Sequence, residues 1–292
     1  MPRHRAGALW NVEDLTPSLT IGEVLRRSTE HLADRGTETP RLDAELLLAK
    51  ALGLQRIELY MHLDRPLQET ELDLARELVA RRSRREPLQY VLGEWGFRRL
   101  TLTVDRRALI PRPETEIVVE RCLALLNGAP EPRVLDVGTG SGAIALSIAH
   151  EHAGARVTGI DVSRDALALA AENVVRTGVN VELVAQDLFV GLPTGPWELV
   201  VSNPPYVPVA EVEALAPEVS EWEPRSAIAS AGQTEAVVSA ALDVLSPGGA
   251  LVLETHWNGA QEAASLLRSH GYSDVVVTHD LAGHERVVEG RR

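Results

Sequence analysis

The sequence predicts a doubly wound, seven-stranded α/β sheet that follows a small all-α helical domain and a β-hairpin connector. Apolar residues recur at helical spacing through residues 20–85, whereas short apolar runs alternate with helical patterns through residues 111–292. A glycine-rich loop follows the first of those runs, as it does in many nucleotide-binding sheets. With 292 residues, the chain is long enough for one α/β domain and a smaller one.

The segment before the sheet is expected to form a helical bundle. Residues 1–19 show no periodicity, and we expect a flexible tail there. Glycines and prolines divide residues 20–85 into about four or five short helices. We interpret this bundle as a module that docks a partner, because the sheet domain does not need it to fold. A purely supporting domain is the alternative.

Residues 86–110 change character and are expected to form the β-hairpin connector. Apolar runs at 90–93, 95–97 and 100–104 predict short strands. This is also the one basic region of the chain, with Arg81, Arg82, Arg84, Arg85, Arg98, Arg99, Arg106 and Arg107. The region is either a solvated face or a surface that meets RNA or an acidic partner, and the sequence leaves both open.

Three successive predicted strands end in groups that suit a nucleoside ligand. The strand before residue 138 runs into a loop whose glycines allow a tight turn and close approach of a ligand: Gly138, Thr139, Gly140, Ser141 and Gly142. The strand at 156–160 ends in Asp161, about 20 residues past the loop, where a carboxylate can accept hydrogen bonds from ribose hydroxyls. Asp187 follows the strand at 181–185 and can receive an adenine amino group.

The fourth strand, at 198–202, ends in the most informative stretch of the chain, Asn203-Pro204-Pro205-Tyr206. The prolines fix φ and lack N–H groups, so their carbonyls remain as acceptors. The Asn203 oxygen can accept a hydrogen bond from an NH2 group, and the Tyr206 ring can hold that group's plane. Because ligands of doubly wound sheets bind beyond the carboxyl ends of the strands, we expect all four strand ends to line one crevice.

The glycine-rich loop favours S-adenosylmethionine (SAM) over a dinucleotide. Its glycines read GxGxG, where the dinucleotide fingerprint has GxGxxG. SAM has no pyrophosphate, so its site tolerates Asp136, an acid that would repel a dinucleotide. A hydride-transfer enzyme also has no evident use for residues 203–206. We therefore predict methyl transfer to a planar amide or amino nitrogen, and we disfavour hydride transfer.

The remaining segments complete the sheet domain. Residues 109–116 begin a helix, with Pro113 near its first position and two glutamates at its positive end, and they could fold over the methionine end of the cofactor. A proline-containing loop occupies residues 208–224, and a Ser-Pro-Gly-Gly turn occupies residues 246–249. Helices are predicted at 235–245 and 260–270, and the last three of the seven strands at 250–254, 274–278 and 285–289.

Composition narrows the class of protein. The chain has 29 basic and 42 acidic residues and a net charge of −13, which disfavours wrapping a nucleic-acid backbone. The single cysteine, Cys122, lies in an apolar helical pattern and is expected in the core, as fits a reducing cytoplasm. No signal peptide, membrane-spanning run or metal-binding pattern is evident. We expect a cytoplasmic monomer without a metal.

Several of these segments resemble one known family. Residues 136–142, Asp161, residues 203–206 and the Pro-Gly-Gly turn at 247–249 resemble the class I SAM-dependent methyltransferases, which have a Rossmann-like sheet. More specifically, residues 85–93 (REPLQYVLG), 109–116 (LIPRPETE), 223–229 (EPRSAIA) and 284–288 (HERVV) are similar to the PrmC/HemK group. The resemblance covers residues 20–292. That group comprises protein-(glutamine-N5) methyltransferases that modify the Gly-Gly-Gln loop of peptide-chain release factors.

The resemblance implies a role for each motif. The loop at 138–142 would cradle the amino-acid part of SAM, Asp161 would bind its ribose, and Asp187 and Leu188 would flank its adenine. Asn203 would touch both SAM and substrate, and the glutamine pocket would be completed by Pro204, Pro205 and Tyr206. Of these, Asn203, Pro204 and Tyr206 would form the catalytic set.

The chain departs from the family pattern at two points, and two other functions stay open. Leu188 stands where some members carry an aromatic residue, and Thr255-His256 follows Glu254 where members usually have a glycine. An amino-group methyltransferase of the N6-adenine type, acting on nucleic acid, fits residues 203–206 but is disfavoured by the charge of −13. A non-catalytic SAM- or RNA-binding module is disfavoured by the intact motifs.

Overall fold

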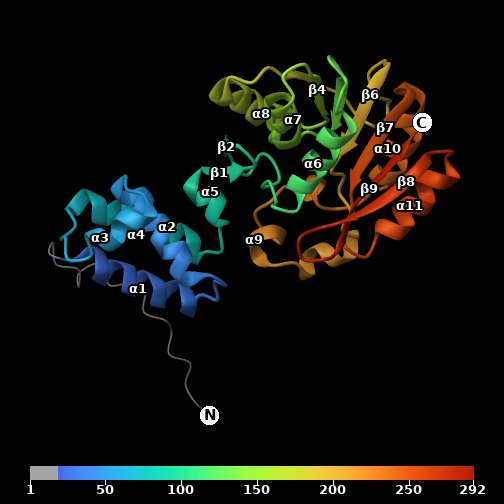
Figure 1. The fold of residues 1–292 in the computed structure, drawn as a ribbon. Helices are drawn as coiled ribbons and strands as arrows, with labels where there is room; N and C mark the ends of the chain where they lie inside the picture. The colour runs from blue at the N-terminus through green and yellow to red at the C-terminus, as the bar shows by residue number, and fades with distance from the viewer. Residues whose placement is uncertain (1–18) are drawn as a thin grey trace, which may run out of the picture. The chain divides into compact units, whose positions relative to one another are not determined.

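The computed structural model describes residues 19–292 and divides them into two compact units (Figure 1). The first unit ends at Leu92, and the second is Gly93–Arg292. The tail expected at residues 1–19 lies, except for Leu19, outside the described residues. No helix among residues 19–292 combines the length and apolar character needed to cross a membrane.

The first unit is all helical. It contains α1 (Ile21–Asp34), α2 (Pro40–Leu52), α3 (Arg56–Met61), α4 (Glu69–Ser83) and α5 (Leu88–Leu92). Thr20 and Glu23 form a capping box at the start of α1, and Gly53 ends α2 in a left-handed conformation. The helices bury leucines such as Leu25, Leu47 and Leu78 in one apolar core. A helical domain in this part of the chain was expected from the periodicity.

Helix α5 corrects one prediction. Residues 90–93 were expected to form a strand, but Leu88–Leu92 is a helix. Leu88 and Val91 are three residues apart and therefore share one helix face, and both are buried in the apolar core of the first unit. Packing against α2 and α4 therefore decides the conformation of a segment too short to show a helical period.

The β-hairpin consists of β1 (Glu94–Phe97) and β2 (Leu100–Thr103), which pair antiparallel. Phe97 and Leu102 are buried in the core of the second unit. Arg98, at the turn, forms a bidentate ion pair with Glu151, with nitrogen–oxygen distances of 2.5 and 2.9 Å. Several other arginines of the basic region also have carboxylate partners inside their own unit, namely Arg81 with Glu86, Arg82 with Asp43, and Arg107 with Asp105 and Glu172.

The second unit contains a seven-stranded sheet, as predicted. Its spatial order is β5-β4-β3-β6-β7-β9-β8. The strands are β3 (Arg133–Val137), β4 (Arg156–Asp161), β5 (Glu182–Ala185), β6 (Trp197–Ser202), β7 (Leu245–Glu254), β8 (Ser273–His279) and β9 (Glu285–Arg291). The first five are parallel, and β9 lies antiparallel between β7 and β8. The chain runs outward from β3 to β5 and then returns to β6 on the other side of β3, which makes the β3–β6 junction the topological switch point.

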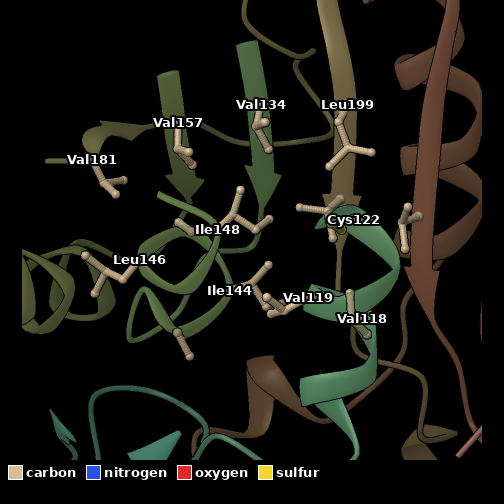
Figure 2. Close-up of a cluster of buried hydrophobic side chains, with 14 of the residues drawn as sticks. Val118, Val119, Cys122, Val134, Ile144, Leu146, Ile148, Val157, Val181 and Leu199 are labelled. Atoms are coloured by element: carbon tan, nitrogen blue, oxygen red, sulfur yellow. The ribbon is translucent and has the colours of Figure 1, made fainter. Parts of the chain in front are cut away.

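Helices cover both faces of this sheet. On one face, α6 (Thr115–Leu125) and α7 (Ala143–Glu151) pack Val118, Cys122 and Ile148 against Val134 and Leu199 (Figure 2). Helix α8 (Arg164–Thr177) packs on β4 and β5. On the other face lie α10 (Gln233–Val244) and α11 (Ala260–Ser269). Successive strand residues such as Val134 and Leu135 belong to opposite cores, as the period of two requires.

One long connection follows β6. Residues 203–232 contain two short 3₁₀ helices, η2 (Val209–Ala214) and η3 (Arg225–Ala227), and the short helix α9 (Pro217–Ser220) between them. Val207 and Ala229 form an isolated parallel bridge, and the backbone N–H of Ser230 donates to the carbonyl of Val207 at 2.8 Å. The connection is therefore tied back to its own start, beside the carboxyl end of β6.

Candidate active site

A cavity opens at the carboxyl ends of the parallel strands, at the switch point between β3 and β6. Most of the residues predicted from the four strand ends line it, namely Gly138, Thr139, Gly140, Ser141, Asp161, Asp187, Leu188, Asn203, Pro204 and Pro205. Gly142 and Tyr206 are not among the lining residues. The strand ends that the sequence predicted to share one crevice therefore do so.

The glycine-rich loop is held from below by Asp136, the fourth residue of β3. Its side chain is fully buried, and its Oδ2 accepts hydrogen bonds from the Thr139 hydroxyl at 2.7 Å and from the backbone N–H of Ala145 at 3.2 Å. Burial raises the pKa of Asp136 to about 7. The acid therefore fastens the loop to the start of α7 rather than facing a ligand directly.

The three glycines of the loop all have positive φ, at 75° for Gly138, 57° for Gly140 and 83° for Gly142. Gly142 is the N-cap of α7, and a Cβ there would lie 3.1 Å from Cδ1 of Leu146. Its role is thus to turn the chain into the helix, which explains why it does not line the cavity.

Asp161 connects the loop to the end of β4. Its Oδ2 accepts from the backbone N–H of Gly140 at 2.9 Å, and its Oδ1 accepts from that of Ser163 at 2.8 Å. Burial raises its pKa, and these hydrogen bonds act against that shift. Each carboxylate oxygen keeps a second lone pair, so the group can accept two further hydrogen bonds from a diol.

The far wall of the cavity follows β5. Asp187 accepts a hydrogen bond from the backbone N–H of Phe189 at 2.9 Å, and Leu188 lines the cavity between them. Phe189 also lines the cavity, with 61% of its surface exposed. Sequence reasoning missed this aromatic residue, although it directly follows Leu188, the position at which some family members carry an aromatic residue.

The segment before α6 forms another wall, as expected for residues 109–116. Leu109, Pro111 and Arg112 line the cavity together with Thr115. Helix α6 begins at Thr115, so Pro113 precedes the helix instead of opening it. The Arg112 guanidinium donates to both carboxylate oxygens of Glu223, at 2.6 and 2.8 Å, and so ties this wall to the connection after β6.

Glu223 begins the family-like segment 223–229, but sequence reasoning assigned no role to its side chain. Its side chain is 1% exposed, and burial raises its pKa to about 6 in spite of the opposing charge of Arg112. Pro224, Ser226 and Ala227, which follow it, line the cavity. The ion pair therefore joins two cavity walls whose residues are 111 positions apart in the sequence.

Asn203 comes directly after β6, and its side chain lies at the edge of the cavity. Its Nδ2 donates to the Thr115 hydroxyl at 3.4 Å, so its Oδ1 is turned away from Thr115. Pro204 is buried, and Pro205 is half-buried beside it. Tyr206 is also half-buried, its ring centroid lies 5.9 Å from that of His256, and burial raises its pKa to about 12.

The chemistry of this arrangement is that of a polar nucleoside site next to an amide-binding turn. Asp161 can accept from a ribose, and the loop brings its backbone close to the cavity before the N-terminus of α7. Asn203 and the carbonyls beside the prolines can accept from an NH2 group. Within residues 19–292, no group of three or more His, Cys, Asp or Glu side chains is arranged to hold a metal ion.

Comparison with known proteins decides between the classes that this chemistry allows. Residues 120–280 match the family model described as methyltransferase small domain, and residues 23–93 match the PrmC N-terminal domain. A protein of Geobacter sulfurreducens named release factor glutamine methyltransferase is 42% identical over 276 residues, which cover 93% of this chain and 96% of that protein. The chain belongs to the release factor glutamine methyltransferase family.

A second relative of this methyltransferase supports the same family, and a solved structure supports the fold. The release factor glutamine methyltransferase of Chlorobaculum tepidum is 42% identical over 275 residues, with 89% of this chain and 93% of that protein covered. Among solved structures, the 16S rRNA N2 G1207 methyltransferase of Thermus thermophilus, in complex with AdoMet and guanosine, is 17% identical with a TM-score of 0.51. That match covers 68% of this chain and 49% of the other, and it shows that the two share a fold.

Proposed function

We propose that this enzyme transfers a methyl group from SAM to the side-chain amide nitrogen (N5) of the glutamine in the Gly-Gly-Gln motif of peptide-chain release factors. The observation that carries the proposal is the position of Asn203, Pro204 and Pro205 on the wall of the cavity that Asp161 and the glycine-rich loop also line. A nucleoside site and an acceptor for a planar NH2 group are thus adjacent. The names of the relatives supply the substrate class.

The described residues fit SAM as the cofactor. Gly138, Thr139, Gly140 and Ser141 would line the space for its amino-acid part, and Asp161 would accept hydrogen bonds from both ribose hydroxyls through its free lone pairs. Asp187 and Leu188 would flank the adenine, and the exposed Phe189 ring offers the flat aromatic face that Leu188 lacks.

The substrate poses a chemical difficulty that Asn203 and Pro204 address. An amide nitrogen is a weak nucleophile, because its lone pair is delocalised into the carbonyl group. When bound, SAM supplies an electrophilic methyl group on a sulfonium. Asn203 Oδ1 and the Pro204 carbonyl would accept the two N–H groups of the glutamine, fix the plane of the amide, and stabilise the positive charge that develops on nitrogen.

Positioning then provides much of the acceleration. A nitrogen held about 3–3.5 Å from the methyl carbon reacts as in an intramolecular step. Proline at positions 204 and 205 suits this task, since fixed φ angles keep the two acceptors in place without a ligand. Tyr206 follows directly, and its part in the glutamine pocket stays a prediction, as do the monomeric state and the cytoplasmic location.

The helical unit is proposed to dock the release factor. The sheet unit holds the cavity by itself, so the PrmC N-terminal domain at residues 23–93 is free for a partner. The N6-adenine alternative is disfavoured because a net charge of −13 repels a phosphate backbone, and because several arginines of the basic region already have carboxylate partners.

The deciding experiment is methyl transfer from labelled SAM to a purified release factor. We expect label on the intact factor and none on a factor whose Gly-Gly-Gln glutamine is replaced, nor on bulk RNA or DNA. The Asn203→Ala enzyme serves as control and should lose about 10²–10³ in kcat, the scale of one preorganised polar contact. Label on nucleic acid, or on the factor without its glutamine, would overturn the proposed substrate.

A further inference from the structure

Glu254 is a buried acid behind the active site that the mechanism above does not use. It is the last residue of β7, and only 1% of its surface is exposed. In the parallel pairing of β6 with β7, Ser202 lies opposite Leu253, so the next residues along the two strands, Asn203 and Glu254, are neighbours. On its other side, Glu254 lies opposite Val287 of β9. The carboxylate is thus enclosed by the sheet at the point where the substrate-binding turn begins.

The carboxylate has unused hydrogen-bonding capacity. Its Oε2 is buried and has no hydrogen-bond partner among the described residues. A buried polar atom without a partner costs free energy, and in native proteins it commonly marks a functional group. Glu254 does not line the cavity, whereas Thr115 and Asn203, which lie in front of it, do.

Thr115 and Asn203 connect Glu254 to the site. The Thr115 hydroxyl and the Asn203 amide both lower the pKa of Glu254, whereas burial, the largest influence, raises it to about 7. Asn203 Nδ2 also donates to the Thr115 hydroxyl at 3.4 Å. The three side chains therefore form one polar cluster, with Thr115 and Asn203 on the cavity side and Glu254 behind them.

Other charged groups face this cluster from the elements around it. Arg286 on β9 lowers the pKa of Glu254, and Glu114 before α6 raises it. Glu254 in turn raises the pKa of Tyr206, whose ring lies beside His256. Arg286 is shared between Glu254 and Asp280, because its Nη2 also donates to Oδ2 of Asp280 at 3.4 Å. Glu254 therefore has no dedicated counter-ion, and its charge depends on the amide and hydroxyl in front of it.

We propose that Glu254 is a positioning residue that, together with Thr115, holds the Asn203 side-chain amide with its NH2 group toward the protein and its oxygen toward the glutamine. An ionised carboxylate only accepts hydrogen bonds, so it is compatible with Asn203 in this orientation alone. A protonated carboxyl group can donate, and it would favour the flipped amide. Flipped, Asn203 would present donors to the NH2 donors of the glutamine and repel them.

This inference rests on the proposed function and assigns the ionised form of Glu254 to the active enzyme. At low pH Glu254 is protonated and the Asn203 amide is free to flip, so the rate of methyl transfer is low. The rate rises as pH passes through the pKa of Glu254, at or below about 7, because a cation bound in the cavity lowers that pKa further.

The test compares wild-type enzyme with Glu254→Gln, Glu254→Asp and a matched control, Glu262→Gln, which removes an exposed carboxylate on α11. At saturating SAM, Glu254→Gln should lower kcat about tenfold to hundredfold, the scale of one hydrogen bond to a charged group, and leave the dissociation constant of SAM unchanged. The rise of rate with pH should disappear in Glu254→Gln and be partly kept in Glu254→Asp. Glu262→Gln should behave like wild type.

A second readout does not depend on activity. The side-chain amide signal of Asn203 in a nitrogen-15 NMR spectrum, assigned by its loss in Asn203→Ala, should titrate near pH 7 or below in wild type and not in Glu254→Gln. A titration with no methylation of release factors would leave the inference standing and overturn the proposed substrate instead. An Asn203 amide that does not titrate, or a pH–rate profile that Glu254→Gln leaves unchanged, overturns the inference and attributes the profile to another acid such as Asp136.

Discussion

Replacing Asp161 is the sharpest test of how the cavity holds a cofactor. The carboxylate performs two tasks: it accepts the backbone N–H groups of Gly140 and Ser163, and its remaining lone pairs face the cavity. Asp161→Ala removes both tasks. Asp161→Asn keeps the shape of the side chain. However, an NH2 group replaces one of the two carboxylate oxygens and then faces a backbone N–H donor.

The expected loss of affinity follows from these contacts. Two ribose hydroxyls that donate to one carboxylate contribute about 1.5 kcal/mol each, at the low end for hydrogen bonds to charged groups, or about 3 kcal/mol together. Since every 1.4 kcal/mol is a factor of ten, the dissociation constant for SAM should rise about 150-fold in Asp161→Ala. Asp161→Asn should lose as much, because the donor–donor contact displaces the loop at Gly140.

Isothermal titration calorimetry with SAM measures both variants directly. Asp165→Asn is the matched control, because it removes an exposed carboxylate from the first turn of α8 that does not line the cavity. Its dissociation constant should equal that of the wild type. If Asp161→Ala folds normally and binds SAM with unchanged affinity, the ribose lies elsewhere and the assignment of this strand end is wrong.

Three further predictions concern the core, the loop and the helical unit. Burial raises the pKa of the Cys122 thiol, so we expect an alkylating reagent to modify it only after unfolding, and stoichiometric labelling of native protein would contradict this. A Cβ at Gly159 would lie 2.7 Å from the Thr139 hydroxyl, so Gly159→Ala should lower the free energy of unfolding by about 1–3 kcal/mol in urea denaturation, whereas Gly96→Ala, with nothing within 4 Å, should not. A chain that begins at Gly93 should bind SAM like the full protein but methylate a release factor poorly, and equal turnover would make the helical unit a mere support.

The sheet and the cavity were predictable because their signals are local. Buried parallel strands appear as short apolar runs, and the polar groups that line the cavity follow directly at the strand ends, so Asp161 and Asn203 could be placed at the cavity from the sequence alone. Strand β7 was predicted to begin at residue 250, but it begins at Leu245. The Pro-Gly-Gly sequence expected to form a turn lies inside this strand, at a register irregularity next to β6.

The interactions that sequence reasoning missed are contacts between distant segments. Arg112 and Glu223 meet across 111 positions of sequence, and neither has a local pattern that pairs it with the other. Glu254 looks in sequence like the polar end of an apolar strand, and only the neighbouring β6 and α6 show that it is buried beside Asn203 and Thr115. Helix α5 is decided by packing in the same way, since five residues are too few to show a period.

The irregular edge of the sheet affects how copies of the protein meet. A long, regular edge strand offers unpaired backbone groups to any other strand and is a template for aggregation. Strand β8 is the outer strand on one side, and its pairing with β9 is interrupted by two register shifts, while Asp274 has a φ of 48°. Such bulges twist an edge away from flat pairing. On the other side, β5 has only four residues. Both edges of the sheet are thus poor templates, so we expect the enzyme to have little tendency to join another copy edge to edge, even at high concentration.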